Sequence, residues 1–224
     1  MDSDDTSLPA RLERQVKFME DNSNVGVCGS YVQTLGTYEQ KREFPLDSSE
    51  LKIELLFGCC ISNHSAMIRN AFLKKYGLLY NHAYVPAEDY EFWVRCSRYF
   101  ELSNIPEVLV HYRIHGNQFS SLYKIKQDNS VQAVREIQIK ELGLLPTREE
   151  LLLHEMVSWH IFKPDIEFLN AVDEWFIKLI NANRETMRFP EPQFTNILAK
   201  KFFLYVIKLS NQVCYHGQLF IIHL

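Results

Sequence analysis

Two aspartates near the start of the chain are spaced as ligands of a metal ion would be. Asp2 and Asp4 belong to the cluster Asp2-Ser3-Asp4-Asp5. Side chains two positions apart in an extended segment point to the same side, so these two carboxylates could converge on one cation. Such a pair suits Mg²⁺ or Mn²⁺, and the ion can take phosphate oxygens as its remaining ligands. The spacing predicts a divalent metal site that holds a phosphate group.

The same cluster also has the composition of a helix start. Asp5, Thr6 or Ser7 could cap a helix that Pro9 opens and that apolar residues continue to about residue 21. The two interpretations are compatible.

A second acidic motif, Glu88-Asp89, opens a segment with helical periodicity. The helix dipole favours an ionised carboxylate at this end, whereas burial in a substrate cleft would raise the pKa of Asp89 toward the range useful in a general base. The alternative is that Glu88 or Asp89 only caps the helix. A third segment, at 106–120, is also rich in polar groups. No such motif follows it.

These segments, in this order, resemble the family 2 inverting glycosyltransferases of bacterial surface-polysaccharide synthesis. The likeness runs from Met1 to about Ser120 and also includes Val25-Gly26-Val27 and the segment 64–69. It implies a GT-A fold, the fold of nucleotide-diphospho-sugar transferases, with a mixed sheet between helices. Members of that family carry a nucleotide-binding half before the first acidic motif. The sequence begins at that motif, so we expect a partial GT-A domain.

The resemblance also implies roles for single residues. Asp89 would be the general base that takes the proton of the acceptor hydroxyl as it attacks the anomeric carbon, which is thereby inverted. Asp2 and Asp4 would hold Mn²⁺ or Mg²⁺ and the donor. Arg113, whose planar fork pairs with phosphate or carboxylate, and His115 would support the donor diphosphate, with His115 as a further candidate ligand of the metal.

Three further residues are weaker candidates for contacts with the acceptor. They are Glu88, His64 and Trp93, and for His64 the role of a hydrogen-bonded core histidine is equally open. The predicted substrates are a nucleotide-diphospho-sugar donor and a glycan or lipid-linked acceptor. The sequence leaves open whether copies of the chain associate, or whether another chain supplies the nucleotide-binding half.

Composition narrows the class of protein. The chain has 224 residues, of which 46% are hydrophobic and 13% aromatic, enough to bury a sizeable core. Its formal net charge of -4 lacks the basic excess that nucleic-acid binding requires. Five cysteines without a CxxC pair predict buried thiols in a reducing cytoplasm. No apolar run reaches the length of about 20 residues that a bilayer demands. We therefore expect a soluble cytoplasmic protein, with peripheral binding at the inner membrane face as an open alternative.

The expected fold is α/β over residues 1–121 and helical over 122–224. In the first part the patterns predict strands at 25–33, 60–68 and 108–113, a polar hairpin or loop at 34–47, and helices at 9–21, 48–56, 70–77 and from 88. In the second part they predict helices at 130–142, after a capping box at Thr147, after Asp165 and from Pro192. Five aromatic residues are predicted to form core there: Trp159, Phe162, Phe168, Trp175 and Phe176.

Two other functions compete with the transferase. Asp2-Ser3-Asp4-Asp5-Thr6 also fits the DxDxT pattern of phosphatases in which the first aspartate is the nucleophile. That pattern follows a buried strand and precedes a second metal motif, and neither is evident. The other competitor is a catalytically silent fragment that acts at most as an assembly or binding module, because strand edges exposed by a missing half would favour oligomerisation.

Overall fold

The computed structural model describes residues 4–116, 123–163 and 165–215, with side chains described as far as residue 211. By its internal contacts the chain divides into two compact units, Met1–Arg135 and Glu136–Leu224. The first unit contains the described strands, and the described elements of the second are helices. This arrangement confirms the predicted mixed α/β fold class with a helical C-terminal region. The predicted boundary at 121/122 lies outside the described residues.

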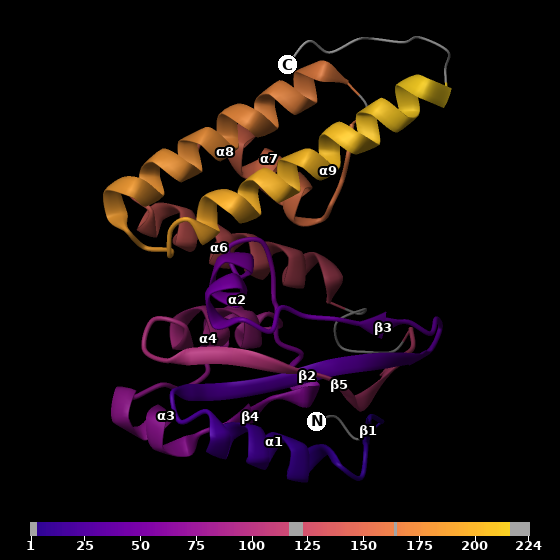
Figure 1. Cartoon of the computed structure of the whole chain (residues 1–224), viewed down its shortest axis with the longest axis vertical. Coiled ribbons are helices and arrows are strands. Elements are labelled where there is room, and N and C mark those ends of the chain that lie inside the picture. Colours follow the sequence, from indigo (N-terminus) through magenta and orange to yellow (C-terminus); the bar gives the residue numbers. More distant parts are fainter. Residues whose placement is uncertain (1–3, 117–122, 164, 216–224) are drawn as a thin grey trace. The chain divides into compact units, whose positions relative to one another are not determined.

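The sheet of the first unit is built on two long parallel strands, β2 (Val25–Gly36) and β5 (Glu101–Ile114), which lie side by side in Figure 1. The strand order is β1-β5-β2-β3, and β4 also pairs with β2. The short strands β1 (Thr6–Ser7), β3 (Lys41–Arg42) and β4 (Met67–Ile68) are antiparallel to their neighbours. The sheet is therefore mixed, and the predicted hairpin at 34–47 is confirmed.

Strand β5 begins well before its predicted start at residue 108. Ser30 of β2 pairs with Ile105 and Tyr31 with Val108, so Pro106 and the residue after it have no partner in this register. Proline has no N–H to donate to a ladder, and a bulge lets the strand continue past it. This shift of register breaks the alternation of inward and outward side chains along β5. The sequence pattern therefore predicted only the part of the strand that follows the bulge.

Helices cover both faces of the sheet (Figure 1). Helix α1 (Arg11–Asp21) lies on one face, where Met19 packs with strand residues that include Cys28 and Leu109. Helices α2 (Ser48–Glu54) and α4 (Glu88–Cys96) lie on the other. The larger core forms on that side, from buried residues that include Val27, Leu51, Leu55, Tyr90, Trp93 and Leu102.

The helices of this unit follow their predictions closely. Helix α3 (Asn70–Tyr76) ends at Gly77, whose φ of 63° is the left-handed conformation that a glycine adopts without strain. Two predicted caps are corrected. Helix α1 follows Ala10, which makes no side-chain capping bond, so the predicted cap at Asp5, Thr6 or Ser7 is wrong, and Thr6 and Ser7 form β1. The cap of α2 is Asp47 rather than a serine, because its side chain accepts a hydrogen bond from the Glu50 backbone at 2.9 Å and the serines are already helical.

The predicted strand at 60–68 is wrong over most of its length. Only the short β4 is a strand, and a 3₁₀ turn, η1 (Asn63–Ser65), precedes it. Long-range contacts hold this turn: the Gln15 amide of α1 donates to the Ser65 carbonyl at 2.7 Å, and the Ser65 hydroxyl accepts from the Ser30 backbone at 3.1 Å. These contacts override the local preference of the apolar run.

Helix α6 (Lys124–Glu141) runs across the division between the units, and α7 (Arg148–Ser158), α8 (Ile166–Thr186) and α9 (Gln193–Tyr215) belong to the second unit. Helices α7 and α8 start where their caps predict, whereas α6 begins six residues before its predicted start at residue 130. Thr147 and Glu150 form a complete capping box, and Asp165 accepts from the Phe168 backbone at 2.6 Å. No helix in the described part of the chain is long and apolar enough to cross a membrane.

The core of the second unit contains most of the predicted aromatic residues. Phe168, Trp175 and Phe176 are buried, and Trp175 donates from its indole nitrogen to His154 at 3.2 Å. Trp159 is 49% exposed, which corrects the prediction, because it follows the last turn of α7 instead of lying on its buried face.

Candidate functional site

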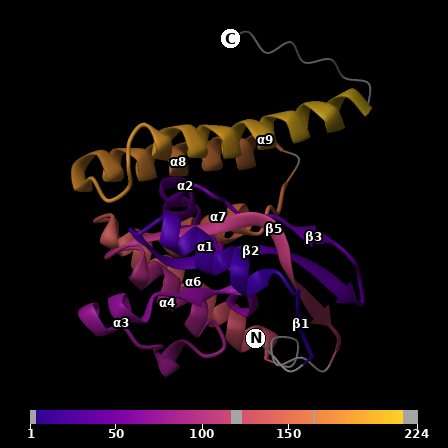
Figure 2. The same cartoon turned by 60° about the horizontal axis from the view of Figure 1, so that its bottom comes forward.

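The first acidic motif is held beside the end of strand β5. Strand β1 pairs Thr6 with His111, and Leu8 donates from its backbone to Leu109 at 3.0 Å. Figure 2 shows β1 alongside the last part of β5. This pairing places Asp4 and Asp5, the two residues before β1, opposite the residues that follow His111. The pairing therefore brings two sequence motifs together that lie more than a hundred residues apart along the chain.

Arg113 and His115 both contact the acidic motif. The Arg113 guanidinium donates to the Asp4 carbonyl at 3.1 Å, and its backbone N–H donates to the Asp5 carboxylate at 3.0 Å. His115 Nε2 lies 2.9 Å from Asp4 Oδ2. The hydrogen bond with His115 is the main reason why the pKa of the Asp4 carboxyl is lowered from its ordinary value. Arg113 therefore contacts the acidic motif, through the backbone carbonyl of Asp4.

His64 joins the first acidic motif from the 3₁₀ turn η1. Its Nδ1 lies 2.7 Å from Asp5 Oδ2, and the Asp5 side chain is fully buried. The imidazole also lies against Tyr112, with ring centroids 4.2 Å apart. The sequence analysis assigned Asp5 only a capping role, so this contact was missed. Both partners were visible as polar residues, but nothing local indicates that they meet.

The second acidic motif starts helix α4 without capping it. The cap residue is Ala87, which makes no side-chain hydrogen bond, so the simple capping alternative is not observed. Asp89 Oδ1 accepts from the Tyr90 backbone at 2.7 Å. The pKa of Asp89 is raised to about 6, mainly because burial desolvates the carboxylate, and the charge of Glu88 raises it further. A charge on His64 lowers it, so His64 lies within electrostatic range of both acidic motifs.

Glu88 has a buried carboxylate oxygen, Oε2, without a hydrogen-bond partner among the described residues. An unsatisfied buried acceptor costs free energy, on the order of 1–3 kcal/mol or more for a charged group.

Two residues that the sequence analysis missed lie close to Asp89. Tyr80 donates to the Asn63 side chain at 3.3 Å, and its pKa is raised to about 12 by burial and then by the charge of Asp89. Cys59 is exposed to solvent, which corrects the prediction that all cysteines are buried. The atoms around its sulfur nevertheless desolvate a thiolate, so the pKa of the Cys59 thiol is raised well above its usual value, again with a contribution from Asp89.

Trp93 lies in the core rather than on an open surface. Its side chain is completely buried, and its indole N–H has no hydrogen-bond partner among the described residues. It packs edge-to-face on Phe92, which stacks on Tyr80 with ring centroids 4.3 Å apart. Trp93 therefore packs beneath Phe92 and Tyr80 as part of the core.

Two of the residues predicted to bind a metal, Asp4 and His115, lie in contact with each other. Asp4 and His115 offer a carboxylate oxygen and an imidazole nitrogen in mutual contact, and both are donor types that divalent ions accept. Within the described ranges no group of three or more histidine, cysteine, aspartate or glutamate side chains is arranged to hold a metal. Asp2 lies outside the described residues. The donors fit the predicted ion in kind, and an ion would replace the contact between Asp4 and His115.

Comparison with known proteins finds relatives but no match to a family model. A protein of Haemophilus influenzae described as an uncharacterized glycosyltransferase is 32% identical over 146 residues, which cover 60% of this chain and 45% of the relative. The O-antigen biosynthesis glycosyltransferase WbnJ of Escherichia coli is 33% identical over 125 residues, 52% of this chain and 46% of that protein.

A third relative is the amylovoran biosynthesis glycosyltransferase AmsE of Erwinia amylovora, 28% identical over 116 residues, 50% of this chain and 43% of that protein. The chain thus spans less than half the length of the relatives it matches. All of them carry the name glycosyltransferase, which confirms the predicted likeness to glycosyltransferases at this general level. The assignments to family 2 and to the GT-A type stay predictions.

Proposed function

We propose that this chain carries the catalytic part of a metal-assisted, inverting glycosyltransferase of family 2 with a partial GT-A domain. It would transfer a sugar from a nucleotide-diphosphate donor to a hydroxyl of a glycan or lipid-linked acceptor. The observation that carries the proposal is the position of His64, in contact with Asp5 of one acidic motif and within electrostatic range of Asp89 of the other. The names of two relatives, which refer to O-antigen and amylovoran biosynthesis, favour a glycan acceptor.

Asp89 is the proposed general base. Its carboxylate would accept the proton of the acceptor hydroxyl while the oxygen attacks the anomeric carbon from the face opposite the diphosphate. The bond from that carbon to the diphosphate oxygen would break, and the configuration would invert. A pKa of about 6 suits this task, because the group is mostly ionised at pH 7 and is still a stronger base than an ordinary aspartate. Glu88, with its unsatisfied buried oxygen, would accept a second hydrogen bond from the acceptor.

The other end of the site would bind the donor. Asp4 and His115, together with Asp2, are the proposed ligands of a Mn²⁺ or Mg²⁺ ion, which would neutralise the diphosphate leaving group when bound. Arg113 donates a hydrogen bond to the Asp4 carbonyl, and its positive charge would lie beside the bound diphosphate. In this arrangement His64 binds Asp5 and would fix the position of the donor-binding residues relative to Asp89.

Replacement of His64 by glutamine tests the link between the two ends. Loss of a positive charge near Asp89 raises the pKa of Asp89 further, so more of the base is protonated at a given pH. We expect kcat/KM for sugar transfer to fall several-fold near pH 6 and to recover near pH 8, with little change in kcat at high pH. The measurement is a pH profile of nucleoside diphosphate release with a panel of UDP- and GDP-sugars. His82→Gln, at an exposed position, is the control, and an unshifted profile would contradict the link.

Replacement of Asp4 by asparagine tests the donor end. Calorimetric titration with UDP and with GDP is expected to show binding at least tenfold tighter in Mn²⁺ than without metal. Asp4→Asn should remove this gain, because a neutral amide is a poor ligand for a hard cation. Asp21→Asn, at a 61% exposed position that pairs with Lys17, is the matched control. Metal-independent binding, or a gain that survives Asp4→Asn, would remove Asp4 from the proposed site.

A further inference from the structure

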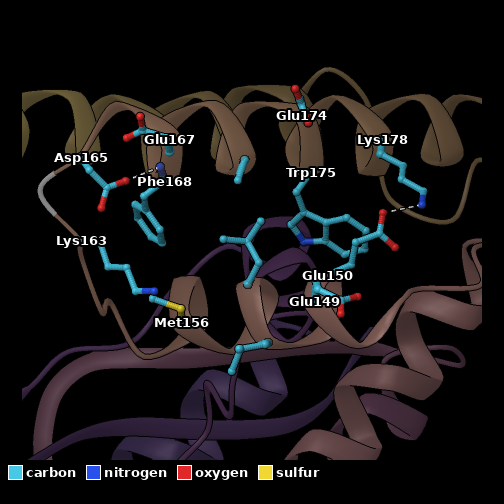
Figure 3. A pocket seen from close by; sticks show the side chains of 13 residues that line it. Glu149, Glu150, Met156, Lys163, Asp165, Glu167, Phe168, Glu174, Trp175 and Lys178 are labelled. Atoms are coloured by element: carbon cyan, nitrogen blue, oxygen red, sulfur yellow. Dashed lines mark hydrogen bonds and ion pairs between the residues drawn. The ribbon is translucent and has the colours of Figure 1, made fainter.

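An open groove lies between helices α7 and α8 of the second unit, with a volume of about 590 Å³. Apolar side chains form its floor, and Figure 3 shows Phe168 and Trp175 pointing from α8 toward α7, with Met156 on the opposite wall. Ala171 leaves room between these larger residues. We call this feature the α7–α8 groove. Two helices that flank an apolar floor form the kind of surface into which a third, amphipathic helix can pack.

The rim of the α7–α8 groove is acidic. Five carboxylates and two ammonium groups line the groove, so its net formal charge is negative. One ammonium group, that of Lys178, is already paired with Glu150 at 2.6 Å. Glu167 and Glu174 are exposed on α8 and lie two helical turns apart along the rim. An occupant that fits this groove has an apolar face flanked by positive charge.

Helix α9 of the same chain presents such a face. Phe203, Leu204 and Ile207 are 62%, 55% and 39% exposed, and Lys200 and Lys208 are exposed beside them. These five residues, which we call the α9 stripe, follow the spacing i, i+3, i+4, i+7 and i+8 and therefore share one side of the helix. The helix contains three lysines and no aspartate or glutamate. An exposed apolar stripe of this kind is typical of an interaction surface.

The α9 stripe cannot fill the groove of its own chain. Tyr205 anchors α9 on α7 and α8, with its ring 5.7 Å from that of Phe168 and its hydroxyl donating to the Val157 carbonyl at 3.2 Å. In this position Phe203, Leu204 and Ile207 stay exposed, although Leu204 and Lys208 also line a small pocket with Val157 and His160. We propose that the α9 stripe of one copy binds in the α7–α8 groove of a second copy, and reciprocally, so that two chains form a closed dimer.

The charged residues of the two surfaces have compatible spacings. With a helical rise of 1.5 Å per residue, Glu167 and Glu174 are roughly 10 Å apart along α8, and Lys200 and Lys208 are roughly 12 Å apart along α9. Each lysine can therefore lie near one glutamate while Phe203 and its apolar neighbours enter the groove. The pairs lie at the rim, so they are expected to contribute mainly specificity, and the apolar stripe most of the affinity.

Charge reversal tests the proposal on the complete chain. The stripe variant is Lys200→Glu with Lys208→Glu, and the rim variant is Glu167→Lys with Glu174→Lys. Sedimentation velocity over a range of concentrations should show a dimer for the unchanged chain and a dissociation constant at least tenfold weaker for each variant alone. An equimolar mixture of the two variants should regain the dimer, because both contacts of the mixed pair then join opposite charges.

Controls separate this interface from general surface effects. Asp173→Lys and Ile177→Ser change exposed residues of α8 outside the groove lining and should leave the dimer intact, whereas Phe203→Ser with Leu204→Ser should abolish it. Circular dichroism confirms that each variant folds. The proposal is overturned by a monomer at every concentration, by variants that associate like the unchanged chain, or by a mixture that fails to recover. Growth beyond a dimer would also contradict the reciprocal contact.

Discussion

Replacement of Asp89 by asparagine is expected to reduce sugar transfer by roughly a hundredfold to ten-thousandfold, the usual contribution of a general base. The amide has nearly the same shape but cannot accept the proton. In the unchanged protein kcat/KM should rise with pH through about 6, the pKa of Asp89. Release of nucleoside diphosphate measures both effects. Glu91→Gln, which changes another carboxylate of α4, one that pairs with Arg95, is the control.

The same substitution is expected to stabilise the fold at neutral pH. The folded-state pKa of about 6 lies above the ordinary value of 3.8, so the folded protein disfavours the ionised form. This penalty is fully present above about pH 6, fades as the pH falls toward 4, and is absent below that. A shift of this size corresponds to at most about 3 kcal/mol.

We therefore expect the asparagine variant to unfold with a free energy higher by about 1–3 kcal/mol at pH 7 and equal near pH 4. Urea denaturation at the two pH values measures this difference. Loss of transfer together with gain of stability would mark Asp89 as a residue kept for its chemistry. Transfer that survives in Asp89→Asn would sink the assignment of the base.

Replacement of Trp93 by alanine should destabilise the first unit by about 3–5 kcal/mol, the usual cost of deleting a fully buried aromatic side chain. Trp93→Phe keeps most of the packing and removes an indole N–H that has no described partner, so its cost should be much smaller. Thermal and urea denaturation measure both.

The phenylalanine variant also separates two roles of Trp93. A purely structural residue should leave the acceptor KM of Trp93→Phe near that of the unchanged protein. An increase in this KM without loss of stability would instead support the role on the acceptor side that the sequence motif predicts. The comparison needs both variants, because Trp93→Ala alone cannot distinguish a damaged core from a damaged site.

The features that the sequence by itself determined are those whose physical cause is local. The caps at Thr147 and Asp165 and the glycine stop at Gly77 each depend on bonds or backbone angles within three or four residues. The same holds for Asp89 at the start of a helix. The helical second half was predictable for this reason, whereas the mixed sheet of the first half was expected only from the family resemblance.

Only the tertiary structure decided which of these pieces meet. It pairs Asp5 with His64 and Asp4 with His115, bends residues 63–65 into a turn held by Gln15, and places Trp93 in the core. Contacts such as these join residues about 50 to more than 100 positions apart. They depend on the path of the whole chain through the sheet, on which local periodicity and propensity carry no information.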